Sequence, residues 1–262
     1  MQFTTLLFDV QEGVAHITLN RPKEVNSINL EISRDLLHAI LQCDEDPLVR
    51  AVIISGAGSL FCAGGDLKTF TAQGKQLPYY VKEVTTYLHA ALSRLIRMDA
   101  PVIAAVHGFA VGAGMSLALA CDMVLAAQSA QFNVAYTRVG LTPDGSMSYI
   151  LPRIVGLRKA LELALTNRTL SAQEAFDWGI VNKVVPDAEL LTQAKALAAQ
   201  LAAGAPKAIG GVKRLLHGGW TETLETQMED ESQTIADMAR TEDTHEGITA
   251  FLEKRRPNFR GQ

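Results

Sequence analysis

Asp144 is the first residue whose type and setting could do chemistry. It lies in residues 140–149, GLTPDGSMSY, between a proline and a glycine and among small or apolar neighbours. A carboxylate in such a place could act as a general acid and base or as a nucleophile. Pro-Asp-Gly is also a common turn sequence, so the chemical interpretation needs support from elsewhere in the chain.

Two glycine-rich stretches could supply that support, because glycine has no side chain and lets backbone N–H groups approach a ligand closely. They are residues 55–68, SGAGSLFCAGGDLK, and residues 107–122, HGFAVGAGMSLALACD, and each follows a short apolar run typical of a buried strand. A helix that begins near Gly112 and Ala113 would direct unpaired N–H groups at the loop before it. Two such donors, one from each strand end, could form an oxyanion hole for a carbonyl oxygen.

Other functions fit the glycine stretches less well. A dinucleotide site needs a third glycine where Phe61 stands, and the chain has no GxxxxGK[ST] phosphate loop. Residues 114–118, GMSLA, come within one residue of the GxSxG elbow of esterases, but a late histidine such as His217 lies in a polar, helix-like segment. Tight packing between helix and strand is an alternative role for Gly108 and Gly112.

The elements that must position these groups alternate between strand and helix over the first part of the chain. LLFDV and VAHITLN flank Glu12-Gly13 and predict a hairpin. The patterns predict buried strands at 50–58, 101–108 and 123–127, and helices at 30–46 and 78–98. Strands joined by helices imply a largely parallel sheet with both faces covered. After about residue 145 nearly all patterns are helical, so the sequence predicts an α/β core with a helical C-terminal part.

The composition is that of a soluble globular protein, with 262 residues, of which 48% are hydrophobic and 20% charged. A net charge of −4 indicates neither nucleic acid nor a membrane surface as a partner. Cys43, Cys62 and Cys121 form no CxxC pair, which argues against a disulfide scaffold and a structural zinc site and favours a cytoplasmic protein. Residues 102–121 are long enough to span a membrane, but their glycines and His107 predict a strand, a turn and a buried helix instead.

Several separated motifs resemble the enoyl-CoA hydratase/isomerase (crotonase) superfamily, in the same order along nearly the whole chain. They are RPKEVNSIN (21–29), FCAGGDL (61–67), VHGFAVGAGMSLALACD (106–122), SAQFNVAYTRVGLTPD (129–144), LTNRTLSAQEAFDWGIVNKVV (165–185) and EGITAFLEKRRPNF (246–259). The resemblance implies a spiral ββα core over residues 1–200, which binds acyl-CoA, and a helical part over 201–262, which forms trimers or hexamers and covers the active site. The implied substrate is an acyl thioester of coenzyme A, with no metal and no other cofactor.

The resemblance also implies site residues, position by position. The backbone N–H groups of Gly65 and Ala113 match the oxyanion donors, although position 113 is usually glycine in the hydratases. The implied coenzyme-binding residues are Val25 beside the adenine, Ala63, Asp66, Leu67 and Lys68 along the pocket, and Phe251 and Lys254, which reach the coenzyme of a neighbouring subunit. Residues 69–90 are expected to line the acyl end.

The sequence departs from the family's hydratases at two positions. Those enzymes use two glutamates to add water across a double bond, and Ser116 and Tyr136 stand in their place. Neither side chain is a general base near neutral pH. Single-aspartate isomerases of the superfamily, including the ring-epoxide isomerases of phenylacetate degradation, carry their acid at the position of Asp144. The resemblance therefore favours an isomerase that shifts a double bond through a thioester enolate, with Asp144 as acid and base.

The same aspartate is compatible with a second chemistry. In the 4-chlorobenzoyl-CoA dehalogenase branch an aspartate at this position attacks the ring as a nucleophile. His89 matches that branch's catalytic histidine, and Tyr136 matches a tryptophan that helps to place the aspartate. His89 equally fits a polar position on an ordinary helix. Hydration by a non-standard mechanism and acyl-CoA binding without catalysis are two further alternatives.

Overall fold

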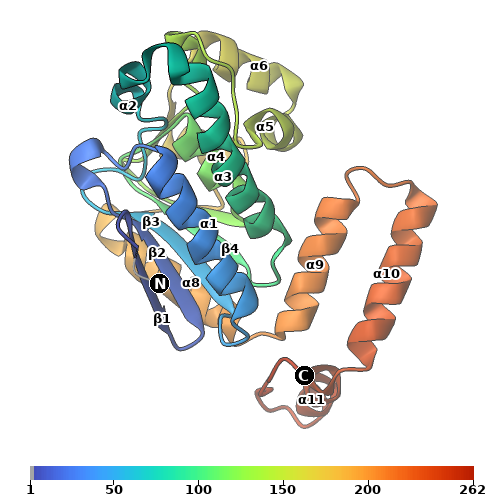
Figure 1. Ribbon diagram of the computed structural model, residues 1–262. Coiled ribbons are helices and arrows are strands. Elements are labelled where there is room, and N and C mark those ends of the chain that lie inside the picture. The colour runs from blue at the N-terminus through green and yellow to red at the C-terminus, as the bar shows by residue number, and fades with distance from the viewer. Residues whose placement is uncertain (1–2) are drawn as a thin grey trace.

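The computed structural model describes residues 3–262 and confirms the predicted α/β class (Figure 1). Its main sheet has six strands in the order β1-β2-β3-β4-β6-β9. Their bounds are β1 Leu6–Gln11, β2 Val14–Leu19, β3 Ala51–Gly56, β4 Val102–Val106, β6 Met123–Ala127 and β9 Lys183–Val185. β1 and β2 form the predicted antiparallel hairpin, and every other neighbouring pair in this sheet is parallel.

Helices cover both faces of the main sheet, as a parallel sheet of apolar strands requires. On one side α1 (Leu30–Glu45) packs against α3 (Leu77–Arg97), and on the other α8 (Leu190–Ala202) packs against β3 and β4 (Figure 1). Each residue of β4 is buried, and so are the first five of β3. The carboxyl ends of these two strands lead into the two glycine-rich stretches.

A second, smaller sheet lies beside the first and was not predicted as a separate unit. It contains β5 (Phe109–Val111), β7 (Gln131–Asn133) and β8 (Leu170–Ser171), with β5 and β7 parallel. Residues 102–121 therefore form β4, a turn, the extra strand β5 and the buried helix α4 (Ala113–Ala120). Within residues 3–262, no helix is long and apolar enough to cross a membrane.

Four shorter helices complete the core. They are α2 (Leu67–Ala72), α5 (Met147–Val155), α6 (Leu157–Thr166) and α7 (Ala172–Asp177). Ser171 and Glu174 form the reciprocal capping box at the start of α7 that their spacing predicts. α5 begins directly after the Asp144 loop, so it helps to fix where that loop lies.

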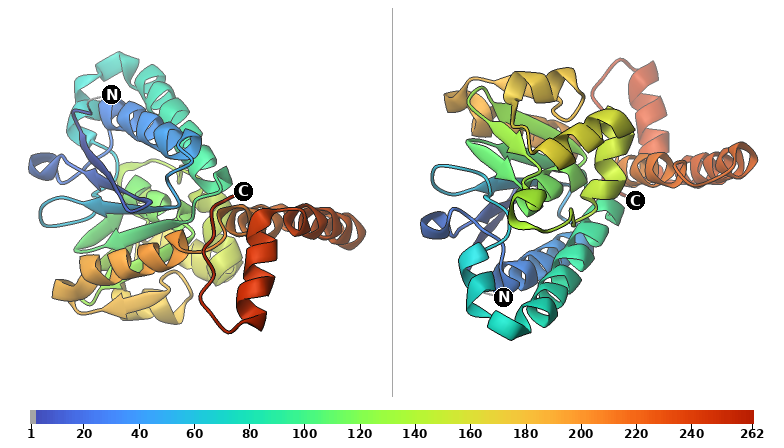
Figure 2. Two further views of the ribbon diagram at one scale, coloured as in Figure 1. Left: turned by 90° about the horizontal axis from the view of Figure 1, so that it is seen from below. Right: turned by 90° about the horizontal axis from the view of Figure 1, so that it is seen from above.

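The C-terminal helices form an arm that extends away from the core (Figures 1 and 2). They are α9 (Pro206–Gly218), α10 (Leu224–Ala239) and α11 (Glu242–Leu252). A buried ion pair holds the root of the arm, since Lys213 Nζ lies 2.7 Å from Asp122 Oδ2 and also donates to the Ala100 carbonyl at 3.0 Å. The predicted domain boundary between residues 200 and 201 falls within α8 and stays a prediction.

Candidate active site

The predicted catalytic groups Gly65, Ala113, Tyr136 and Asp144 line one cavity of about 390 Å³. The walls are mainly apolar, and they come from residues 63–65, from α3, from the start of α4 and from residues 135–144. Residues 63–65 follow β3, and Gly65 forms an isolated parallel bridge with Ile28; this short segment is called the strand end below. The residues expected at 69–90 contribute Phe70, Val81, Val84, Thr85 and Leu88. Among the lining residues, all of which fall within the described range, Asp144 carries the single carboxylate.

The backbone on either side of Gly65 determines where its N–H points. Ile28 donates to the Gly64 carbonyl at 2.7 Å, and Asp66 donates to the Ile28 carbonyl at 2.9 Å. In a parallel bridge of this kind, Gly65 directs its own N–H away from Ile28. This N–H has no hydrogen-bond acceptor within residues 3–262, and Gly65 lines the cavity.

Gly64 makes this strand end possible. Its φ of +90° is one that residues with a side chain rarely adopt, and a Cβ there would lie 2.8 Å from the Val111 carbonyl oxygen. The strand end can therefore pack directly against the end of β5. This close approach brings the two glycine-rich stretches together.

The second unpaired donor is the N–H of Ala113, at the start of α4. Gly112 precedes it with a φ of +52° and a ψ of −121°, and the Ala113 N–H has no acceptor in the described part of the chain. α4 is fully buried and carries no charged residue, so the positive end of its dipole meets little solvent. Two N–H groups without an acceptor, lining one cavity, are the donors that an oxyanion hole requires, and their joint action on one oxygen stays a prediction.

Asp144 is held by two hydroxyl groups. The Tyr136 hydroxyl donates to Asp144 Oδ1, and the Ser116 hydroxyl donates to the Asp144 backbone carbonyl at 2.9 Å. The two hydroxyl oxygens lie 3.1 Å apart. Burial and the nearby Asp144 charge raise the pKa of the Tyr136 phenol above its ordinary value, so the phenol stays protonated and acts as a donor.

His89 lies behind Asp144 rather than in the same cavity. Its Nε2 accepts a hydrogen bond from the Gly145 N–H at 3.1 Å and lies 3.7 Å from Asp144 Oδ2. Its side chain is 50% exposed and lines a second cavity of about 710 Å³ between α3, α5 and α9. A catalytic role for His89 stays a prediction, and in this geometry the Nε2 lone pair is already engaged.

Of the residues predicted to hold the coenzyme, Ala63 and Leu67 line the cavity. Val25 does not line it, but its carbonyl accepts from the Ala63 N–H at 3.1 Å. Lys68 is exposed on α2. Their contacts with coenzyme A stay predictions.

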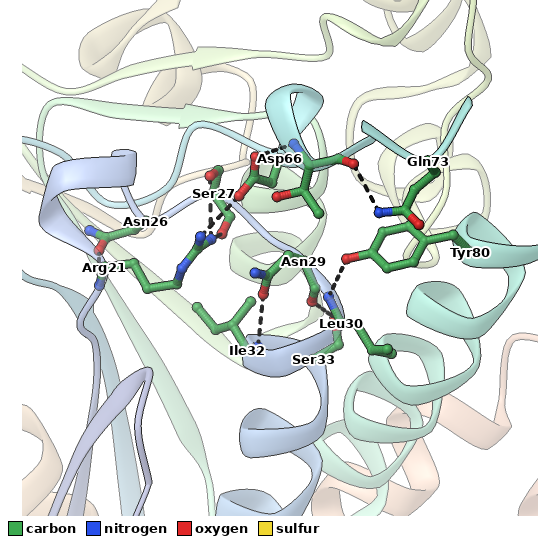
Figure 3. Close-up of polar contacts among 11 residues, drawn as sticks. Arg21, Asn26, Ser27, Asn29, Leu30, Ile32, Ser33, Asp66, Gln73 and Tyr80 are labelled. Carbon is green, nitrogen blue, oxygen red and sulfur yellow. Dashed lines mark hydrogen bonds and ion pairs between the residues drawn. The ribbon is translucent and has the colours of Figure 1, made fainter. Parts of the chain in front are cut away.

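Asp66 directs its carboxylate into the protein (Figure 3). It accepts from the Thr69 N–H at 3.0 Å and from Arg21 Nη2 at 2.9 Å. Although burial acts to raise it, the pKa of the Asp66 carboxyl is held below its usual value because these two donors favour the charged form. Sequence reasoning missed Arg21, although it opens the RPKEVNSIN motif.

Phe251 lies in α11 and Lys254 two residues beyond its end, and α11 lies beside the start of α9. The Phe251 side chain is 82% exposed, and neither residue lines the cavity of its own chain. The predicted contact with a neighbouring subunit's coenzyme remains a prediction. Within the described residues, no group of three or more His, Cys, Asp or Glu side chains is arranged to hold a metal ion.

The family model for enoyl-CoA hydratase/isomerase matches residues 9–262. A 1,2-epoxyphenylacetyl-CoA isomerase from Escherichia coli (strain K12) is 38% identical over 258 residues, which is 98% of each chain. A 4-chlorobenzoyl coenzyme A dehalogenase from an Arthrobacter species is 37% identical over 86% of this chain and 82% of its own. The crystal structure of an enoyl-CoA hydratase from Polaromonas sp. JS666 superposes with a TM-score of 0.94 at 36% identity, covering 97% of this chain and 99% of that one. These matches confirm the resemblance and the predicted crotonase-like fold.

Proposed function

Because this chain belongs to the enoyl-CoA hydratase/isomerase family, we propose that it is an acyl-CoA isomerase in which Asp144 moves a proton between two carbons of a thioester. One observation carries this proposal. Among the described lining residues Asp144 supplies the single carboxylate, and the same cavity presents two backbone N–H groups with no acceptor in residues 3–262. The curated isomerase relative supports the same reaction class.

The proposed reaction needs one base and one anion site. The thioester oxygen accepts hydrogen bonds from the Gly65 and Ala113 N–H groups, and Asp144 removes a proton from a carbon of the acyl group. The electron pair of that C–H bond passes into the thioester, and the two N–H groups stabilise the resulting enolate oxygen. Asp144 then returns the proton to a different carbon, the double bond shifts, and the carboxylate is regenerated.

The cavity walls favour an apolar acyl group. Phe70, Val81, Val84 and Leu88 provide apolar surface, on which an aliphatic chain or a ring gains free energy by leaving water. Because Ser116 and Tyr136 stand where the hydratases carry glutamates, the described lining residues include no second carboxylate to activate water. These features favour isomerisation over hydration.

A panel of enoyl-, dienoyl- and aryl-CoA thioesters, followed by absorbance and mass, tests the proposal. We expect a product of unchanged mass from at least one of them, and a rate about 10²–10⁴-fold lower for Asp144→Asn, with acyl-CoA binding nearly unchanged. Asp177→Asn, a surface substitution of the same kind, serves as the control. Rapid hydration of crotonyl-CoA that Asp144→Asn does not affect would contradict the proposal, and binding of thioesters without any turnover would favour a non-catalytic protein.

A second candidate function rests on His89. Its Nε2 lies 3.7 Å from Asp144 Oδ2, and the Arthrobacter relative is a dehalogenase. If Asp144 attacks an aromatic ring, the wild type releases chloride from 4-chlorobenzoyl-CoA and His89→Gln loses that activity. We rank this second, since the Gly145 N–H occupies Nε2.

A further inference from the structure

The strand end that carries Gly65 is clamped by the loop at residues 21–29. Three backbone hydrogen bonds join the two segments, from Ala63 to Val25, from Ile28 to Gly64 and from Asp66 to Ile28. Asn26 adds two more through its side chain, which donates to the Ala57 and Leu60 carbonyls at 2.8 and 2.9 Å. The loop therefore supports the strand end both before and after Gly65.

A side-chain ion pair links the loop to the residue that follows Gly65. Arg21 Nη2 lies 2.9 Å from Asp66 Oδ2, and the two side chains are only 13% and 7% exposed. The other guanidinium nitrogen, Nη1, donates to the Ser27 carbonyl (Figure 3). One planar group thus ties the loop to the residue that directly follows Gly65.

Gly65 has no side chain of its own with which to fix its peptide plane. Its orientation depends on its neighbours, and Asp66 is bonded at both carboxylate oxygens, to Arg21 and to the Thr69 N–H at the start of α2. A guanidinium has the rigid donor geometry for two acceptors at once, whereas an ammonium group is a single point charge on a flexible stem. Arginine suits this bracing function for that reason.

We propose that Arg21 is a positioning residue that aims the Gly65 N–H at the thioester oxygen, by bracing Asp66 against the 21–29 loop. The inference rests on the proposed oxyanion role of Gly65. Arg21 does not line the cavity, so it acts through Asp66 and not by touching the substrate. Loss of the brace weakens the polarisation of the thioester carbonyl before it weakens acyl-CoA binding.

The test measures the thioester carbonyl directly. A ¹³C-labelled saturated acyl-CoA, which has no double bond to shift, is bound to the enzyme and its carbonyl stretch is recorded by difference infrared spectroscopy, alongside kcat and KM. We expect the wild type to lower the stretching frequency relative to free ligand. Arg21→Gln should lose much of that lowering, with kcat about 10- to 100-fold lower and KM little changed.

Two further variants complete the experiment. Arg21→Lys keeps the charge but not the two-nitrogen link, so we expect an intermediate frequency, and this variant decides the question if Arg21→Gln does not fold. Arg34→Gln, which removes an exposed pair with Glu83, should behave as wild type. If both Arg21 variants lower the carbonyl stretching frequency as much as the wild type does, this inference alone is overturned. If the wild type does not lower that frequency, the oxyanion hole is overturned as well.

Discussion

At position 136 a phenol, not a carboxylate, faces Asp144. Tyr136 donates to one carboxylate oxygen, and Ser116 donates to the backbone carbonyl of the same residue. The two positions that hold glutamates in the family's hydratases therefore contribute hydroxyl groups that hold a single acid in place. This network is the structural reason for regarding Asp144 as more than a turn residue.

Removing the Tyr136 hydroxyl tests that role. We expect Tyr136→Phe to lower kcat by about 10- to 150-fold, the effect of losing one hydrogen bond to a charged group, with little change in KM. Steady-state kinetics on the best substrate of the panel measures both values. Tyr79→Phe is a suitable control because the Tyr79 side chain is 69% exposed. Equal losses in both variants, or none in either, would show that the phenol does not place Asp144.

At this scale the resemblance predicted residues that lie together in the fold, but not the contacts between them. Asp144, Gly65 and Ala113 are predicted through the resemblance, and all three line one cavity. The hydrogen bonds from Tyr136 and Ser116 could not be predicted, because they depend on how η3 (Tyr136–Val139) and α4 pack together. Arg21 was missed because a lone arginine in a loop motif gives no signal of a buried ion pair.

At the level of elements, the proposed anion site is a junction between a strand end and a helix start. The strand end at 63–65 and the N-terminus of α4 each contribute one unpaired N–H. Gly64 sets how closely they approach, through its positive φ and its contact with Val111. The geometry of the site therefore depends on backbone packing as much as on side chains.

Gly64→Ala tests this dependence. A Cβ would lie 2.8 Å from the Val111 oxygen at a φ that strains alanine, so we expect unfolding free energy to fall by about 1–3 kcal/mol and kcat to fall more than binding does. Denaturant unfolding and kinetics measure these changes. Gly74→Ala has a φ of +52° with nothing within 4 Å of the added atom, so it isolates the strain without the clash. If Gly64→Ala matches Gly74→Ala in kcat, the close approach does not set the site.

The long elements and some short ones could be predicted from sequence, but the strands of the second sheet could not. The β1–β2 hairpin, α1, α3 and β4 follow from period-2 and period-3.6 patterns or from continuous apolar runs. β5, β7 and β8 have three residues or fewer, which is too short for any period to be recognised. Their existence depends on tertiary pairing, and they form the sheet nearest the site.

For the whole molecule, the main open surface is the arm, whose apolar side chains the single chain does not bury. α9, α10 and α11 extend from the core (Figure 2), and their large apolar side chains are exposed. The most exposed are Leu216, Leu224, Ile235, Phe251 and Leu252. Apolar area of this extent favours association with another protein surface, in keeping with the predicted trimer or hexamer.

Sedimentation of the purified chain tests the predicted assembly. We expect a mass of three or six chains, and we expect Ile235→Lys to lower that mass because a buried lysine in an apolar interface is costly. Gln233→Lys, which adds the same charge on nearly the opposite face of α10, is the control. A wild type that sediments as a single chain would contradict the prediction.

Proton transfer in D₂O tests most directly whether Asp144 carries the proton. Wild type and Asp144→Asn are incubated in D₂O with a 3-enoyl-CoA, or with the panel's best substrate, and the product's isotope content is read by mass spectrometry and NMR. We expect a shifted double bond, with part of the transferred hydrogen still protium because one carboxylate returns what it removed, and almost no conversion by Asp144→Asn. Conversion by Asp144→Asn at the wild-type rate, or a product that has gained water, would contradict it.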